Sequence, residues 1–90
     1  NITSLLTKLK KSNITTITLE DTPGAKDYRS LKLGRKSFAL IVGNEVRGLS
    51  KKVLKKSDHI IKIPMRGKKE SLNVSTAFGI AIYKLLESKK

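Results

Sequence analysis

The feature that most constrains the fold is an uninterrupted apolar run, Phe38–Val42, bounded by Lys36 and Gly43. A short run without alternation is typical of a strand buried in a parallel sheet. His59–Ile63 predicts another strand, which Pro64 stops because proline cannot donate to the hydrogen-bond ladder. The β-branched segment Thr15–Leu19 predicts a third short strand.

Helical patterns alternate with these strands. Apolar spacing predicts an amphipathic helix over Thr3–Lys11, capped by Asn1 or Thr3, and a short basic helix that Ser50 caps. A final helix is expected from about Leu72 to Glu87. Its apolar face is formed by Val74, Ala77, Phe78, Ala81, Ile82, Leu85 and Leu86. Gly79 within it costs about 1 kcal/mol relative to alanine, so close helix packing is expected there. Glu20–Arg35 is expected to be a loop with a helical turn near Asp27–Leu31.

This order of elements predicts one α/β domain over residues 1–90, a parallel sheet with covering helices. Ninety residues bury only about two thirds of their unfolded surface, which makes a partner subunit plausible. The formal charge of +13 favours a polyanionic partner: RNA, DNA or an anionic membrane surface. Sixteen of the twenty basic residues are lysines, so a lysine-rich composition is the alternative explanation.

Several classes of site are disfavoured by composition. The sequence has no cysteine, so disulfides and thiolate metal sites are excluded. His59 is the only histidine, which favours a structural or solvent-facing role and no metal. No apolar run is long enough to span a bilayer and no signal peptide is visible, so we expect a cytoplasmic protein that does not enter membranes.

Two strand-to-helix junctions carry the polar residues of interest. Ile63–Ala77 combines a strand end, a glycine loop and a helix start at which Ser71 and Asn73 can bind polar ligand atoms. Leu40–Ser50 repeats this design, with Glu45 as a polar anchor between two glycines. In parallel sheets, ligands bind beyond the carboxyl ends of the strands, where both junctions lie. The alternatives are turn glycines with a solvated Glu45, and a Ser71 that only caps the helix while Asn73 continues its first turn.

Basic side chains accompany both junctions, and we expect them to contact the polyanionic partner, for which RNA is one candidate. They are Arg47, Lys51, Lys52, Lys55, Arg66, Lys68 and Lys69.

Together the two motifs resemble the SpoU, or TrmH-like, branch of the SPOUT superfamily of tRNA/rRNA methyltransferases. Leu40-Ile-Val-Gly-Asn-Glu-Val-Arg-Gly-Leu-Ser50 is similar to the second motif of that family, and Ile63–Ala77 is similar to the third. The resemblance covers about Phe38–Leu86. It implies a C-terminal trefoil knot, S-adenosylmethionine bound within it, a homodimer with composite active sites, and methyl transfer to a ribose 2′-hydroxyl of tRNA or rRNA.

The resemblance also implies roles for individual residues. Gly43, Ile63 and Leu72 would contact the cofactor through the backbone, and Met65 would line the adenine pocket. The polar active-site residues would be Glu45, Ser71 and Asn73, which arrange cofactor and hydroxyl. The cofactor supplies the electrophile, so the protein must align donor and acceptor and remove a proton.

One family feature has no counterpart in these ninety residues. The first motif of the family, an Asn-x-Gly-type loop with the arginine taken to activate the hydroxyl, is absent together with the first strands of the sheet. None of Arg29, Arg35, Arg47 and Arg66 has the matching context. The chain therefore resembles the C-terminal, cofactor-binding part of such an enzyme. The alternatives are a non-catalytic RNA-binding module and a dimerisation module that retains the knot.

Overall fold

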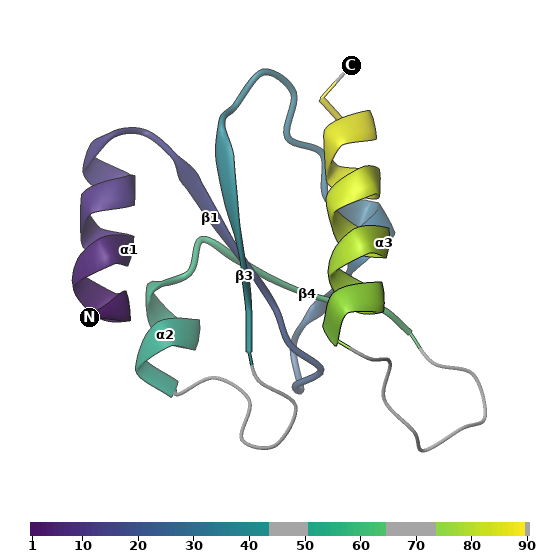
Figure 1. The fold of residues 1–90 in the computed structure, drawn as a ribbon, viewed down its shortest axis with the longest axis horizontal. Coiled ribbons are helices and arrows are strands. Elements are labelled where there is room, and N and C mark those ends of the chain that lie inside the picture. Colours follow the sequence, from purple (N-terminus) through teal and green to yellow (C-terminus); the bar gives the residue numbers. More distant parts are fainter. Residues whose placement is uncertain (44–50, 65–73, 90) are drawn as a thin grey trace.

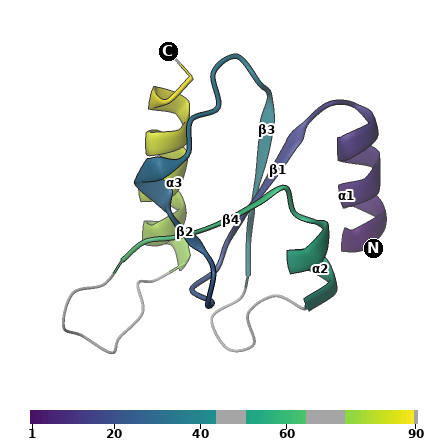
Figure 2. The same ribbon diagram turned by 180° about the vertical axis from the view of Figure 1, so that it is seen from behind.

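The computed structural model describes residues 1–43, 51–64 and 74–89, which form a parallel sheet between two helical layers (Figure 1). Its elements in chain order are α1 (Ile2–Lys11), β1 (Thr15–Leu19), β2 (Lys26–Asp27), the 3-10 helix η1 (Tyr28–Ser30), β3 (Phe38–Val42), α2 (Lys51–Lys56), β4 (His59–Lys62) and α3 (Val74–Glu87). Helices α1 and α2 cover one face of the sheet, and α3 covers the other (Figures 1 and 2). The α/β class is confirmed.

Helix α1 is defined by its two ends. The Asn1 side chain accepts a hydrogen bond from the Ser4 amide at 2.9 Å, which satisfies one of the free N–H groups of the first turn. At the other end Asn13 adopts φ 60°, and the Ile14 amide returns to the Leu9 carbonyl at 2.9 Å. A left-handed residue just past the last turn is a common helix stop. The predicted helix and its Asn1 cap are confirmed.

The four strands lie in the order β2-β4-β1-β3 and all pair in parallel. Strand β1 is central: Leu19 is in register with Val42 of β3 on one side and with Ile61 of β4 on the other. The short strand β2 pairs with the end of β4 and lies within the segment expected to be a loop. Its two residues are too few to show a strand period, and the predicted helical turn beside it is η1.

Strand β3 has the predicted bounds, but the expectation that it is fully buried is wrong. All five of its residues are half-buried. The reason is its place at the edge of the sheet, where it pairs only with β1 among the described residues. An edge strand made only of apolar residues is unusual, because exposed sheet edges usually carry charged residues, proline or a bulge, or are covered by another element.

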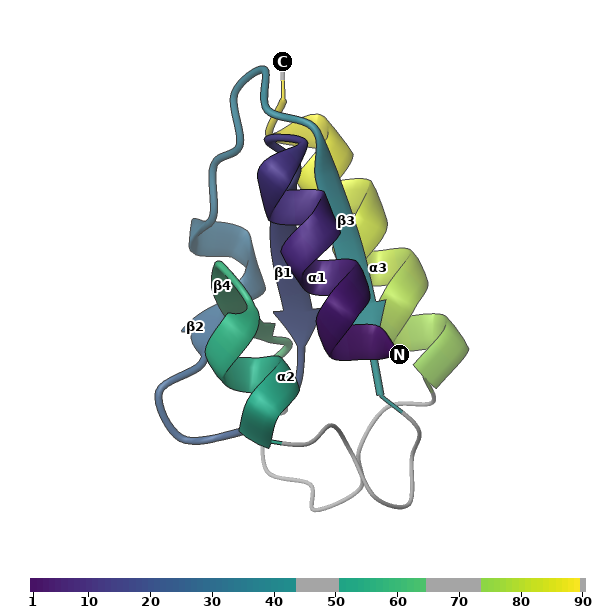
Figure 3. The ribbon, with the colours of Figure 1, turned by 90° about the vertical axis from the view of Figure 1, so that its left-hand side faces the viewer.

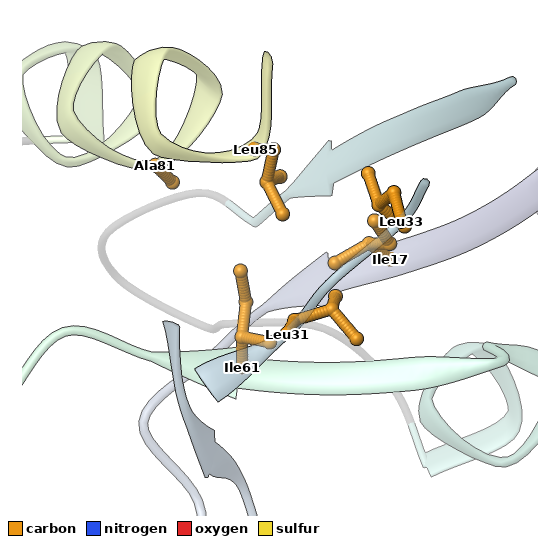
Figure 4. Close-up of a cluster of buried hydrophobic side chains, with 6 residues drawn as sticks. All are labelled: Ile17, Leu31, Leu33, Ile61, Ala81 and Leu85. Carbon is orange, nitrogen blue, oxygen red and sulfur yellow. The ribbon is translucent and has the colours of Figure 1, made fainter. Parts of the chain in front are cut away.

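The main core lies between the sheet and α3 (Figure 4). Ile17 of β1 and Ile61 of β4 meet Ala81 and Leu85 of α3, and all four are fully buried. The segment after η1 closes the cluster with two leucines, Leu31 and Leu33. Chain segments far apart in sequence thus meet in one aliphatic layer.

The opposite face of the sheet is packed differently. Leu6 of α1 and Val53 of α2 are its buried apolar side chains, and beneath them Thr16 and Thr18 of β1 are fully buried as well. Successive side chains of a strand point to opposite faces. The Thr-Ile-Thr sequence of β1 therefore gives one polar and one apolar face.

Helix α3 buries less of its apolar surface than the sequence pattern indicates. Of the described members of its expected face, only Ala81 and Leu85 are fully buried. Four large apolar side chains are exposed: Phe78, Ile80, Tyr83 and Leu86. The expectation that Gly79 serves close helix packing is wrong for the described residues, since a Cβ placed there meets nothing within 4 Å. None of the described helices is long and apolar enough to cross a membrane.

Candidate functional site

Both sequence junctions start from the same edge of the sheet. Strands β3 and β4 lie on either side of β1 and run parallel to it. Gly43 follows β3 and Ile63 follows β4, so the two residues leave the carboxyl edge with one strand between them. Neighbouring strands are about 4.8 Å apart, which places the two strand ends roughly 10 Å apart. The arrangement is the two-sided strand edge at which ligands of parallel sheets bind.

The next helices begin at this edge as well. Helix α2 starts at Lys51 after β3, and α3 starts at Val74 after β4. In Figures 1 and 3 these helix starts lie toward the end of the molecule at which β3 finishes. The first turn of a helix carries free N–H groups and a partial positive charge. The strand and helix ends that frame both junctions therefore converge on one edge.

Only part of the predicted site lies within the described residues. Gly43 and Ile63 are described, and both are half-buried. The three residues with predicted catalytic roles, Glu45, Ser71 and Asn73, lie outside the described residues, as do Met65 and Leu72. Among the predicted RNA-binding residues, Arg47, Arg66, Lys68 and Lys69 also lie outside them. Lys51, Lys52 and Lys55 are described, and all three are exposed on α2.

A polar network fixes the turn between α2 and β4 to the central strand. The Asp58 carboxylate accepts hydrogen bonds from the Thr16 amide at 2.8 Å and from the Thr16 hydroxyl at 3.1 Å. Ser57 donates to the Val53 carbonyl at 2.9 Å and hydrogen-bonds the hydroxyl of the buried Thr18. These bonds set where β4 begins, and therefore the height at which it reaches the carboxyl edge.

The charge state of Asp58 follows from this network. Partial burial on its own would raise the pKa of the carboxyl group. Hydrogen bonds from the backbone and side chain of Thr16, assisted by the nearby Lys10 and His59, outweigh burial and hold the pKa of Asp58 below its ordinary value. The network is built for an ionised carboxylate.

An ion pair lies beside the end of β4, and the sequence patterns did not reveal it. Asp27 is in register with Lys62, and its carboxylate accepts from the Arg29 guanidinium at 3.0 and 2.7 Å. The side-chain hydrogen bond from Arg29 is the main reason why the pKa of Asp27 falls to about 2. Arg29 is thus held by Asp27, which supports leaving it out of a catalytic role.

The structure also contains an open hollow of about 650 Å³ at the opposite, amino edge of the sheet. It is lined by Lys10, Asn13, Ile14, Thr15, Lys36, Asp58 and His59. His59 starts β4 and is half-buried. No group of three His, Asp or Glu side chains in the described part of the chain is placed to hold a metal ion.

Residues 1–83 match the SpoU rRNA Methylase family. An uncharacterised tRNA/rRNA methyltransferase of Mycoplasma genitalium is 42% identical over 85 residues, which are 92% of this chain and 34% of that protein. The chain spans about a third of the length of the curated relatives that it matches first.

Solved structures give the same result for the fold. A TrmH/SpoU tRNA modifying enzyme of A. aeolicus superposes with a TM-score of 0.86 at 31% identity, covering 98% of this chain and 44% of that one. An AdoMet-bound rRNA methyltransferase of Sinorhizobium meliloti gives 0.81 at 25% identity, covering 90% and 31%. An RNA 2′-O ribose methyltransferase gives 0.77 at 29% identity, covering 94% and 32%. The match over most of the chain and the parallel sheet with its two strand-to-helix junctions agree: this chain belongs to the SpoU rRNA methylase family.

Proposed function

We propose that this chain is the cofactor-binding, knot-forming part of an RNA methyltransferase that transfers a methyl group from S-adenosylmethionine to a ribose 2′-hydroxyl of tRNA or rRNA. The observation that carries the proposal is the position of Gly43 and Ile63 on either side of β1 at one carboxyl edge. The AdoMet-bound and 2′-O ribose methyltransferases to which the chain is similar support the cofactor and the reaction class.

The described residues fit such a cofactor. Gly43 has no side chain, so a ligand can approach the backbone at the end of β3. Ile63 is half-buried and directly follows the last residue of β4, so it can offer an apolar side chain and backbone polar groups to a ligand. Leu72 and Met65 would complete this wall, the first through its backbone and the second against the adenine. An apolar cradle with a few backbone polar groups is what a nucleoside cofactor requires.

The polar residues of the junctions would then do the positioning. Bound S-adenosylmethionine would supply a methyl group on a positively charged sulfur. Transfer of that methyl group would require a base to take up the hydroxyl proton, and this chain's residues would have to hold the hydroxyl against the methyl donor. Glu45, Ser71 and Asn73 would orient the hydroxyl and the cofactor. The activating arginine would come from the family's first motif, which these ninety residues lack, together with the first strands of the sheet.

Cofactor binding is tested by titrating S-adenosylmethionine into the chain in a calorimeter. We expect a Kd on the order of micromolar for the wild type. Asn73→Ala removes a polar contact and should weaken binding about tenfold. Thr76→Ala, an exposed position of α3, is the matched control and should leave the Kd unchanged. Equal affinity for both variants, or no heat with the wild type, would contradict the proposal.

The reaction is tested with the full-length protein, bulk tRNA or rRNA and a radiolabelled methyl donor. Digestion of the product to nucleosides should place the label on 2′-O-methylnucleosides. Label on a methylated base instead would refute the ribose assignment while leaving cofactor binding intact.

Self-association belongs to the same proposal, with a second copy of the chain as the occupant of the outer surface of α3. Four large apolar side chains are exposed there, Phe78, Ile80, Tyr83 and Leu86. A homodimer with composite active sites is also what the family resemblance implies. Sedimentation velocity tests it: a dimer supports it, whereas a monomer at high concentration contradicts it. The protein would act in the cytoplasm.

A non-catalytic RNA-binding module is the second candidate function. The exposed lysines of α2 favour it, because RNA binding by them requires no arginine from outside the chain. Absence of cofactor binding together with salt-sensitive RNA binding would select this alternative.

A further inference from the structure

The outer surface of the α1–α2 layer carries an unusual concentration of one charge. Helix α1 has three lysines and α2 has four, and neither helix contains an acidic residue. Helix α3 on the other side carries one lysine and one glutamate. The lysine face, as we call this surface, consists of Lys8, Lys10, Lys11, Lys51, Lys52, Lys55 and Lys56, all of which are exposed. A lysine-rich composition alone does not explain why α1 and α2 carry seven lysines while α3 carries one.

The two helices form one continuous surface. They pack against each other on the same face of the sheet (Figures 1 and 3), and the Lys56 ammonium donates to the Thr7 hydroxyl of α1 at 3.2 Å. Lys51 and Lys52 open α2 at the carboxyl edge of the sheet, whereas Lys10 and Lys11 end α1 toward the amino edge. Helix α1 is about 15 Å long, so the lysine face spans several phosphate spacings of a nucleic acid strand.

Little of this charge is neutralised within the described part of the chain. Asp58 is the one described carboxylate that pairs with a lysine of either helix, at 3.8 Å from Lys10. That carboxylate already accepts two hydrogen bonds from Thr16. The surface continues at the amino edge into the hollow, which Lys10 and Lys36 line together with Asp58 and His59. A row of lysines therefore leads away from the predicted methyl-donor edge.

We propose that the lysine face binds the phosphate backbone of the RNA that flanks the modified nucleotide, guiding it from the carboxyl edge of the sheet across α2 and α1 to the amino edge. This inference rests on the proposed function and adds α1 to it. Lysine ammonium groups bind phosphates without reading bases, so the contact would give affinity and register rather than sequence specificity. RNA is favoured over a membrane because the chain belongs to a family of RNA methylases.

The test compares two triple variants of equal charge. Lys8→Gln/Lys11→Gln/Lys55→Gln removes three charges from the lysine face. Lys26→Gln/Lys32→Gln/Arg35→Gln removes three exposed charges from β2 and the loop before β3, as the matched control. None of these six side chains forms an ion pair with a described carboxylate. Circular dichroism establishes that both variants fold.

Affinity for a fluorescein-labelled RNA stem-loop is measured by anisotropy over a range of KCl concentrations. The lysine-face variant should bind RNA at least about tenfold more weakly. The plot of log association constant against log salt should become shallower by about 2 units of slope, while the control changes little. Equal losses in both variants would overturn the proposal and reduce the effect to net charge.

Two further readouts separate this inference from the proposed function and from a membrane role. Calorimetry with S-adenosylmethionine should give the same Kd for the wild type and the lysine-face variant. If the lysine-face variant binds both RNA and the cofactor as tightly as the wild type, the lysine face does not bind RNA, while the methyltransferase proposal is unaffected. Phosphatidylglycerol vesicles are the third probe. If the lysine-face variant loses more affinity for vesicles than for RNA, the assignment to RNA is overturned.

Discussion

The two helical layers of this small domain differ both in what holds them to the sheet and in what they show to the outside. The α1–α2 layer meets β1 through Thr16 and Thr18, which hydrogen-bond Asp58 and Ser57, and its outer surface is basic. The α3 layer meets β1 through the aliphatic cluster around Ile17, and its outer surface is apolar. The alternating side chains of β1 contact both layers. Hydrogen bonds orient the α1–α2 layer on the sheet, whereas burial of apolar surface stabilises the packing of α3.

The largest expected effect is on the apolar side. Leu85→Ala removes a fully buried side chain from the centre of the aliphatic cluster, and it should lower the free energy of unfolding by about 3 kcal/mol. Urea unfolding followed by circular dichroism measures it. The matched control on the same helix is Thr76→Ala, an exposed position outside the apolar surface of α3, and its effect should stay within about 0.5 kcal/mol.

The polar side should respond less. Asp58→Ala leaves the Thr16 amide and hydroxyl without their acceptor and should cost about 1–2 kcal/mol in the same unfolding assay. Glu87→Ala, which removes an exposed partner of Lys84, is the control and should be nearly neutral. A loss at Asp58 as large as that at Leu85 would show that hydrogen bonds stabilise the α1–α2 layer as strongly as apolar burial stabilises the α3 layer.

The same contrast explains which parts of the fold could be predicted. Strands β1 and β3 have the predicted bounds because β-branched and apolar runs report local strand formation directly. Helix α1 was predictable from its cap and its period. The strand order and β2 were not, since two residues show no period and parallel partners are distant in sequence.

The surfaces and the site were predictable to a different degree. Apolar periodicity predicted a broad buried face on α3. Periodicity does not show how much of that face packs against the rest of the same chain. Among its described members, only Ala81 and Leu85 are fully buried. The junction glycine and isoleucine reached a common edge as predicted, because parallel strands share a direction. The network around Asp58 was missed, since it joins residues 42 positions apart that carry no common motif.

A smaller effect is expected from pH, and it should be confined to the polar side. Asp58 has a lower pKa in the folded chain than the ordinary 3.8. Its ionised form therefore stabilises the fold above about pH 4, and that contribution is lost as the pH falls through the lowered pKa. Comparing wild type with Asp58→Asn isolates it, because Asp27 titrates in both. Their difference in unfolding free energy should shrink as the pH falls below about 4; a constant difference would contradict the role of the charge.

The smallest expected effect on folding, and the sharpest test of the outer surfaces, comes from one exposed residue on each layer. Tyr83 of α3 and Leu5 of α1 are both exposed apolar side chains on helices. Within the monomer, each can be changed to glutamate with a loss of unfolding free energy within about 0.5 kcal/mol. If a second copy covers α3, Tyr83→Glu should shift sedimentation velocity from dimer to monomer, because the charge would be buried without a partner. Leu5→Glu should leave the dimer intact. Dissociation by Leu5→Glu alone would move the interface to the α1–α2 layer, and it would also remove the lysine face from contact with RNA.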